Sequence, residues 1–103
     1  MTSREKLMAA LNHQDCGKIA FDLGATKATG ISASLLYRLR KLNGRDEPVK
    51  VYDTFQMLGL IDAEDAKMFG IDVLPLWSDM TVFGYRNNEW REWTAPDGTP
   101  TLI

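Results

Sequence analysis

The chain has 103 residues, and its 45% apolar and 25% charged residues are those of an ordinary globular domain, which excludes a wholly disordered or fibrous protein. The longest uncharged run, residues 28–37, is about half the length of a membrane-spanning helix. The net charge of −2 gives no basic surface for nucleic acid, so we expect neither nucleic acid nor a membrane as a partner.

The chain has one cysteine, Cys16, and one histidine, His13. A single cysteine excludes an internal disulfide and favours a reducing compartment, and no sustained apolar run follows the charged residues 4–6 as in a secretory signal. We therefore expect a cytoplasmic protein. A structural zinc site takes four nitrogen or sulfur ligands, so we predict no metal site within this chain.

Charge is unevenly distributed along the chain. Residues 1–52 carry nine Lys/Arg and five Asp/Glu, whereas residues 53–103 carry three and nine. We expect complementary charged faces that lie side by side in one fold. The alternative is a basic N-terminal surface for an anionic ligand, with Lys27 as its one well-placed residue.

The first half of the chain predicts a helix, a strand and a second helix. A capping box at Thr2 starts a helix that ends near His13. The apolar run at residues 19–23 predicts a buried strand, and a loop follows at residues 24–30. Ser32 or Ser34 caps the next helix, which presents apolar residues 35, 36, 39 and 42 inward and basic residues 38, 40 and 41 outward.

The second half predicts a helix, a buried strand and a hairpin. Residues 49–51 are expected to be extended, and residues 54–60 to form a short apolar helix or a turn. A second capping box at Asp62 starts a helix that Gly70 ends, and residues 71–77 predict another buried strand. Residues 89–94 and 99–103 flank the turn at 95–98 and predict a hairpin.

This order of elements predicts an α/β fold with right-handed βαβ units and a parallel sheet. Only two strands are expected to be parallel, and a parallel sheet needs neighbours on both faces and edges. We therefore expect the chain to be a single incomplete domain of a longer protein.

Four segments together resemble the N-terminal part of the uroporphyrinogen decarboxylase-like superfamily. They are SREKLMAALNH at residues 3–13, IAFDLG at 19–24, ATGI at 28–31 and GIDVL at 70–74. The resemblance extends from Thr2 to Trp93. It implies the N-terminal portion of a (β/α)8 TIM barrel, here with an N-terminal helix and a β-hairpin insertion, and an active site at the C-terminal ends of the strands.

The resemblance also implies the chemistry. The superfamily contains decarboxylases that act on uroporphyrinogen and methyltransferases that move methyl groups to or from corrinoids and thiols. The decarboxylases grip substrate carboxylates with an Arg-x-x-x-Arg pattern after the first strand, where this chain has LGATK at residues 23–27. We therefore expect inefficient turnover of uroporphyrinogen itself, because bidentate arginine suits its eight carboxylates best and Lys27 is a single point charge.

Two aspartates are the predicted catalytic residues. By the resemblance, Asp79 follows the second strand where a carboxylate would accept hydrogen bonds from pyrrole nitrogens; the alternative is a turn aspartate that binds its own backbone. Asp22 lies near the end of the first strand, where strand alternation directs it to the barrel interior or to the barrel mouth. One interpretation gives Asp22 a role as an acid, a base or a group that orients the ligand. The alternative is structural, with the Asp22 carboxylate accepting hydrogen bonds from the following loop.

The loop at residues 24–30 is the predicted substrate-binding segment. Gly24, Thr26, Lys27 and Thr29 could hold an anion, although the loop matches neither a Walker nor a dinucleotide-binding pattern. The alternative is a loop that simply needs flexible glycines.

Together these observations predict part of an enzyme acting on a tetrapyrrole or in corrinoid-linked methyl transfer. The expected partner is a small molecule, either a tetrapyrrole or a methyl donor or acceptor. No cofactor is expected within this chain, although the complete protein could use a corrinoid or zinc, and the zinc ligands of the methyltransferases would lie beyond this chain. The isolated chain is expected to be inactive and to self-associate. The alternative is a free-standing, non-enzymatic α/β module that binds itself or a partner through an exposed sheet edge.

Overall fold

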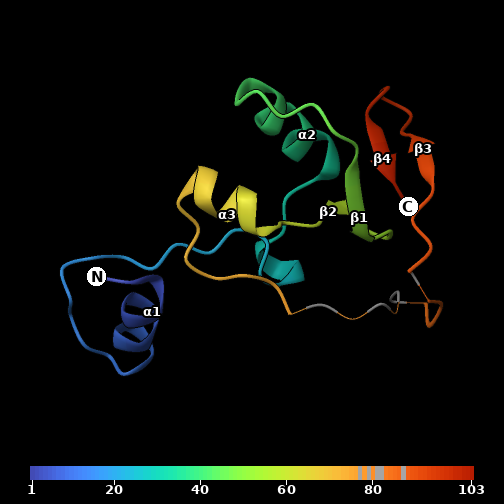
Figure 1. The fold of residues 1–103 in the computed structure, drawn as a ribbon. Coiled ribbons are helices and arrows are strands. Elements are labelled where there is room, and N and C mark those ends of the chain that lie inside the picture. Colours follow the sequence, from blue (N-terminus) through green and yellow to red (C-terminus); the bar gives the residue numbers. More distant parts are fainter. Residues whose placement is uncertain (77, 79, 81–82, 87) are drawn as a thin grey trace.

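A computed structural model describes residues 1–76, 78, 80, 83–86 and 88–103, which form a mixed α/β fold (Figure 1). This confirms the predicted α/β class. In chain order the elements are α1 (Ser3–Leu11), the 3-10 helix η1 (Lys27–Thr29), α2 (Ala33–Leu42), β1 (Val49–Asp53), β2 (Leu58–Gly59), α3 (Ala63–Phe69), β3 (Glu92–Thr94) and β4 (Pro100–Leu102).

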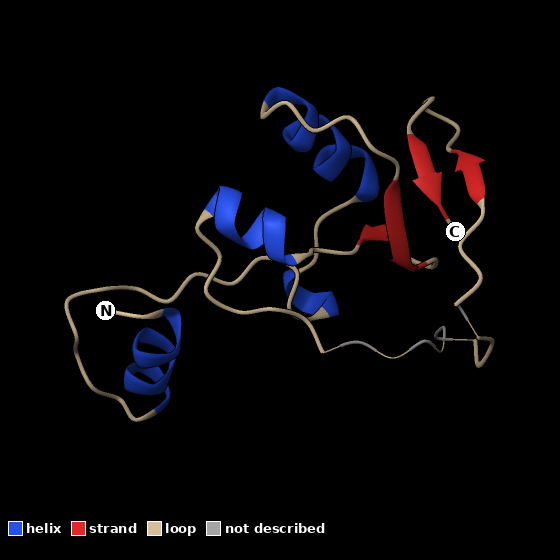
Figure 2. Cartoon of the chain, in the orientation of Figure 1, coloured by secondary structure: helices blue, strands red, loops and turns tan. Residues whose placement is uncertain are grey.

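One open sheet of four strands has the order β2-β1-β4-β3. β1 is antiparallel to β2 and parallel to β4, and β3 is antiparallel to β4. The parallel pair β1–β4 is separated in the chain by β2, α3 and β3. Its strands, however, are not those predicted from the apolar runs (Figure 2).

The apolar core lies between α2 and the sheet. Leu36, Val49 and Val51 are completely buried there. Gly59 permits the close packing, because a Cβ atom at this position would lie 2.8 Å from Leu36 Cδ2 and 2.9 Å from Val49 Cγ1. The full cluster is Ile31, Ala33, Leu36, Val49, Val51, Ile61 and Ile71.

The predicted helix starts are confirmed. Thr2 and Glu5 form the capping box of α1, and Asp62 and Asp65 form that of α3. Ser32 accepts a hydrogen bond from the N–H of Leu35 and caps α2. These side chains satisfy backbone donors that have no partner inside the helix.

The predicted glycine positions at helix ends are also confirmed. Gly70 ends α3 with a left-handed φ of 70°, and Gly44 follows α2 with a φ of 83°. Glycine adopts this conformation without the steric cost that a Cβ atom imposes.

The predicted C-terminal hairpin is confirmed as β3 and β4. The turn contacts α2 through Thr99 Oγ1, which lies 3.2 Å from Ser34 Oγ. Hydrogen bonds from Ser34 and Thr99 lower the pKa of the Asp97 carboxyl to about 2. The segment 54–60, expected as a helix or turn, forms a turn followed by β2.

The two predicted buried strands are wrong as secondary structure. Residues 19–23 and the described residues 71–76 contain no strand, and Trp77 lies outside the described residues. Ile19 is 90% exposed and Leu76 is fully exposed. An apolar run becomes a strand only where other strands pair with its backbone, and in the described residues the sheet forms elsewhere.

The prediction of which α2 side chains face inward is wrong for three residues. They are the two leucines at the ends of the apolar stripe and one arginine. Leu35 and Leu42 are exposed, whereas Arg40 is only 3% exposed. Arg40 is buried because it forms an ion pair with Asp65 at the start of α3, which is itself completely buried. The helical periodicity predicted that Arg40 faces outward, because a charged residue is seldom buried unless it has a partner such as Asp65.

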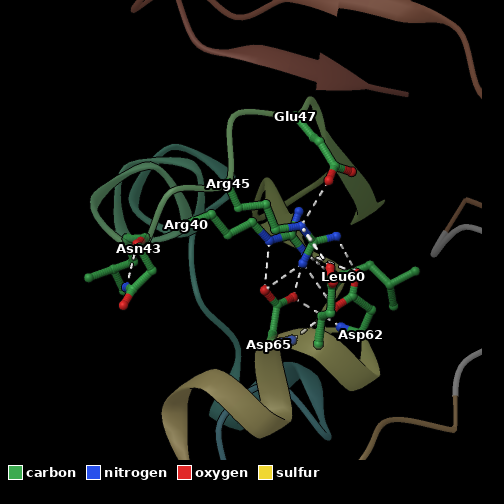
Figure 3. A network of polar contacts seen from close by, with 9 residues as sticks. Arg40, Asn43, Arg45, Glu47, Leu60, Asp62 and Asp65 are labelled. Atoms are coloured by element: carbon green, nitrogen blue, oxygen red, sulfur yellow. Dashed lines mark hydrogen bonds and ion pairs between the residues drawn. The ribbon is translucent and has the colours of Figure 1, made fainter.

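Arg40 and Asp65 form a two-point contact inside the fold (Figure 3). Arg40 Nε lies 2.8 Å from Asp65 Oδ1, and the guanidinium also donates to Asp65 Oδ2. A further Arg40 N–H bonds the carbonyl oxygen of Leu60 at 3.1 Å. The contact joins the end of α2 to the start of α3 and to the strand that precedes it.

Arg45 extends this network toward the surface (Figure 3). It donates to Asp62 Oδ2 at 2.6 Å and to Asp65 Oδ1 at 3.0 Å, and its Nε faces Glu47 and Glu64. The hydrogen bond to Asp62 raises the pKa of Arg45. Burial opposes ionisation of Asp62, but Arg45 outweighs it and holds the pKa of this carboxyl below its usual range.

We expect Asp65→Asn to lower the free energy of unfolding by about 3–5 kcal/mol, because it leaves two guanidinium groups without their buried counter-charge. Glu64→Gln removes an exposed partner of Arg45 and is the matched control, with an expected cost of about 1 kcal/mol or less. Urea unfolding followed by circular dichroism measures both. Equal losses in the two variants would show that the buried network does not hold the fold together.

Candidate functional site

A pocket of about 170 Å³ brings together two of the segments that the sequence predicted as parts of one site. One wall comes from the loop after Gly24 and the other from residues 75, 76, 78 and 80. Its lining residues are Ala25, Thr26, Lys27, Tyr52, Pro75, Leu76, Ser78 and Met80. Larger hollows of about 390 and 410 Å³ lie beside the hairpin strands, but they contain none of the predicted site residues.

The predicted catalytic residue Asp22 accepts a hydrogen bond from the N–H of Ala25 at 3.1 Å. This is the loop-stabilising contact that the sequence allowed as an alternative to catalysis. Gly24 is buried with a φ of 90°, and a Cβ atom there would lie 2.3 Å from Ile61 Cγ1. Asp22 and Gly24 therefore shape the start of the loop, and neither lines the pocket.

Thr26 and Thr29 bind each other rather than pointing freely toward a ligand. Each side chain accepts a hydrogen bond from the backbone N–H of the other, at 3.3 and 3.1 Å. The two residues thus cap η1 and fix the backbone on both sides of Lys27. Of this pair only Thr26 lines the pocket.

Lys27 is the cation of the pocket. Its side chain is about half exposed, and its Nζ lies 3.7 Å from Asp53 Oδ2, whose side chain is only 2% exposed. The Asp53 carboxylate is held in place by the N–H groups of Phe55 and Gln56, at 2.9 and 3.2 Å. Among the described residues Asp53 is the single acidic group within ion-pair distance of Lys27.

Tyr52 forms the floor of the pocket at the end of β1. Its ring is buried, and its hydroxyl donates to the carbonyl oxygen of Thr26 at 3.5 Å, which is long for such a bond. Burial, and then the charge of Asp53, raise the pKa of Tyr52. The hydroxyl therefore stays protonated at neutral pH and acts as a hydrogen-bond donor.

Asp72 links the two segments that approach the pocket. The N–H of Asp72 donates to the carbonyl oxygen of Phe21, and the N–H of Phe21 donates to Asp72 Oδ2, both at 2.8 Å. Asp72 also receives the Ser3 hydroxyl and the Lys6 ammonium from α1, at 2.7 and 2.8 Å. The predicted strand segments therefore lie side by side at this point, although neither is a strand.

The contributions of Tyr52, Asp53 and Asp72 were not predicted from the sequence. Tyr52 and Asp53 come at the end of the alternating pattern of β1. This pattern could have indicated that both residues lie at the end of a strand. Asp72 belongs to the GIDVL segment at residues 70–74, but its polar contacts could not be predicted because its partners are distant in the chain. The predicted catalytic residue Asp79 lies outside the described residues, so its role stays a prediction.

Comparisons with protein-family models, curated proteins and solved structures found no match to this chain. In the part of the chain that the structure describes, no three His, Cys, Asp or Glu side chains are grouped to hold a metal ion. The same residues include no helix with the length and apolar content to cross a bilayer.

We expect the attachment of α1 to depend on the charge of Asp72. Lys6, Ser3 and the Phe21 N–H lower the pKa of the Asp72 carboxyl to about 2. A carboxylate with a lowered pKa stabilises the fold above its usual pKa near 4, and the stabilisation is lost as the pH falls toward 2. Asp72→Asn should therefore release α1 already at pH 7.

Relaxation of the α1 amide ¹⁵N nuclei measures this release as faster local motion of residues 3–11. Asp15→Asn is the matched control, because Asp15 is an exposed carboxylate whose Oδ1 accepts a local bond from Gly17. If the Asp72 variant kept α1 as ordered as in the parent chain at pH 7, the polar attachment of α1 would be wrong.

Proposed function

We propose that this chain forms the N-terminal part of a (β/α)8 barrel of the uroporphyrinogen decarboxylase-like type, which acts on a tetrapyrrole or in corrinoid-linked methyl transfer. The motifs at residues 3–13, 19–24, 28–31 and 70–74 give the resemblance. Any corrinoid or zinc would supply the methyl-transfer chemistry in the complete protein. The residues of this chain would contribute part of the substrate pocket.

One observation carries the proposal: residues 25–27 of the loop and residues 75, 76, 78 and 80 line the same pocket. In a barrel enzyme the segments that follow neighbouring strands converge at the C-terminal face, where substrates bind. The contacts between Phe21 and Asp72 put the two preceding segments next to each other, as neighbouring strands would be. This arrangement supports the proposal even though the described residues form an open sheet.

The pocket is too small for a complete macrocycle. An engineered protein cavity of about 150 Å³ holds one benzene molecule, so the pocket of about 170 Å³ has room for a single ring or side arm. Its apolar wall, formed by Ala25, Pro75, Leu76 and Met80, suits the hydrocarbon part of such a ligand. The chain would thus bind one edge of a substrate whose other parts meet the rest of the barrel.

Titration of the chain with coproporphyrin and, separately, with hydroxocobalamin tests the proposal. We expect at least one of them to shift the amide resonances of residues 24–30, 52 and 76 in ¹H–¹⁵N spectra. Ala25→Gln places a longer side chain in the pocket and should weaken this binding at least tenfold. Ala10→Gln makes the same change on the exposed surface of α1 and should have no effect.

Absence of binding by both compounds would contradict the proposal. So would binding that Ala25→Gln leaves unchanged, provided that the spectrum of the variant shows the fold of the parent chain.

A second candidate function is self-association, and the observation that favours it is the amount of exposed apolar surface. Large apolar side chains are exposed in the segments 19–21 and 74–76 and on the edge strand β3. They include Ile19, Phe21, Leu74, Leu76 and Trp93. Exposed large apolar side chains favour association, and among the described strands β3 lies at an edge of the sheet where a further strand could pair.

We expect the chain to form dimers or larger assemblies at micromolar concentration in sedimentation velocity. The double variant Ile19→Ser, Leu76→Ser should shift the distribution toward the monomer, because it removes two of the most exposed apolar side chains. Leu42→Ser is the matched control, since Leu42 is 82% exposed at the end of α2. A monodisperse monomer for the parent chain would rule out this candidate.

A further inference from the structure

The two edges of the four-stranded sheet differ in how they are covered. On the β2 side the N–H of Ala33 donates to the carbonyl oxygen of Met57 at 2.8 Å. The N–H of Gly59 donates to the carbonyl oxygen of Ile31 at 2.9 Å, so the chain before α2 closes that edge. Among the described residues no strand pairs with the outer side of β3, which lies beyond β4 in Figure 1. A further strand can therefore join the sheet at β3.

The hydrogen bonds of the hairpin determine which backbone groups of β3 reach this edge. Arg91 and Ile103 exchange two backbone hydrogen bonds, at 3.0 and 2.9 Å. In an antiparallel pair, bonded positions alternate with non-bonded positions along each strand. The N–H and C=O groups of Glu92 and Thr94 therefore point away from β4, and they present two donors and two acceptors at the edge.

A second copy of β3 offers the same donors and acceptors, and its two-fold axis can pass through one of three residues. An axis at Glu92 puts two carboxylates directly opposite each other, which is destabilising. An axis at Thr94 puts Glu92 opposite Pro96, which has no N–H to donate. An axis at Trp93 pairs Glu92 with Thr94 of the second copy in both directions. That register forms four hydrogen bonds and moves the two carboxylates apart to diagonal positions.

The side chain of Trp93 favours the same register. Trp93 pairs with Thr101, which pairs with Val49, so the three side chains share one face of the sheet. Val49 and Thr101 are buried, whereas Trp93 is 41% exposed where this face reaches the edge. An axis at Trp93 places the two indoles opposite each other at a non-hydrogen-bonded position, where facing side chains are closest. The exposed Arg91 then lies diagonal to the indole of the second copy, within range for a cation–π contact.

We propose that β3 binds β3 of a second copy of this chain as an antiparallel strand, with the two-fold axis at Trp93. The two sheets then continue into each other across the dimer. The inference rests on the self-association candidate, because it names the surface and the register through which two copies meet. It is independent of the barrel chemistry.

Cysteine cross-linking tests the register directly. Cys16→Ser removes the native thiol, and either Trp93→Cys or Thr94→Cys then supplies one new thiol. In the proposed dimer the two residues 93 are opposite, with Cα atoms about 4.5 Å apart, whereas the two residues 94 are diagonal at about 7–8 Å. A disulfide needs a Cα separation of about 4.4–6.8 Å. We expect mild oxidation to link the Trp93→Cys chains at least tenfold faster than the Thr94→Cys chains, which are the matched control.

Sedimentation velocity of variants at position 94 tests the backbone pairing with Trp93 intact. Thr94→Pro removes an N–H that points to the open edge and leaves the hydrogen bonds between Arg91 and Ile103 in place. We expect it to raise the dissociation constant of the dimer at least tenfold. Thr94→Val keeps the N–H and should stay within twofold of the parent chain. The amide resonances of residues 91 and 103 show whether the hairpin is intact in each variant.

Cross-linking at position 94 that equals or exceeds cross-linking at position 93 would overturn the proposed register. Dimers that survive Thr94→Pro with an intact hairpin would overturn the pairing through β3. If the double variant Ile19→Ser, Leu76→Ser abolished those dimers, self-association would stand without this contact. A parent chain that is monomeric at every concentration would overturn both the pairing and the self-association candidate, whereas the macrocycle titrations test the barrel proposal separately.

Discussion

The buried carboxylate of Asp65 is the group on which most of the fold depends. It is completely excluded from solvent, and two arginines from different parts of the chain donate to it. A buried charge is costly unless it is paired and hydrogen-bonded. One arrangement of α2, the following loop and α3 satisfies the Asp65 carboxylate and the two guanidinium groups together. The apolar core is small, and this polar contact fixes how α3 is oriented against it.

The same network explains the uneven charge of the chain. Arg40 and Arg45 come from the basic half, and Asp62 and Asp65 come from the acidic half. The other ion pairs that join the halves, Lys6 with Asp72 and Lys27 with Asp53, follow the same pattern. The halves are thus complementary, as the sequence predicted, although the main contacts are buried rather than on solvated faces.

Local signals predicted the local structure, and failures arose where distant residues decide the outcome. The capping boxes at Thr2 and Asp62 and the glycines at 44 and 70 act within a few residues, so the helix limits could be predicted. Residues 19–23 have the composition of a strand, but a strand also needs a neighbour to pair with. Arg40 looked like a surface residue because its partner lies 25 positions away.

The candidate site shows the same division between what local sequence predicts and what distant residues decide. Of the loop 24–30, Thr26 and Lys27 line the pocket, whereas Gly24 and Thr29 shape the loop, and substrate binding by these residues stays a prediction. Tyr52 lines the pocket and Asp53 pairs with Lys27 because tertiary packing brings the end of β1 to that loop, which no local pattern encodes. Sequence reasoning thus found the residues with suitable chemistry and missed those that tertiary packing brings to them.

The attachment of α1 has a consequence for how the chain opens. α1 contains no buried residue and lies apart from the sheet, held through Ser3 and Lys6 at a single carboxylate (Figure 1). Because little apolar surface is exposed when α1 detaches, that opening has a lower free energy than global unfolding and a weak dependence on denaturant. The first cooperative unit to separate from the native state is therefore the N-terminal helix, and a protease would cut the connecting residues 12–20 while the core between α2 and the sheet is still intact.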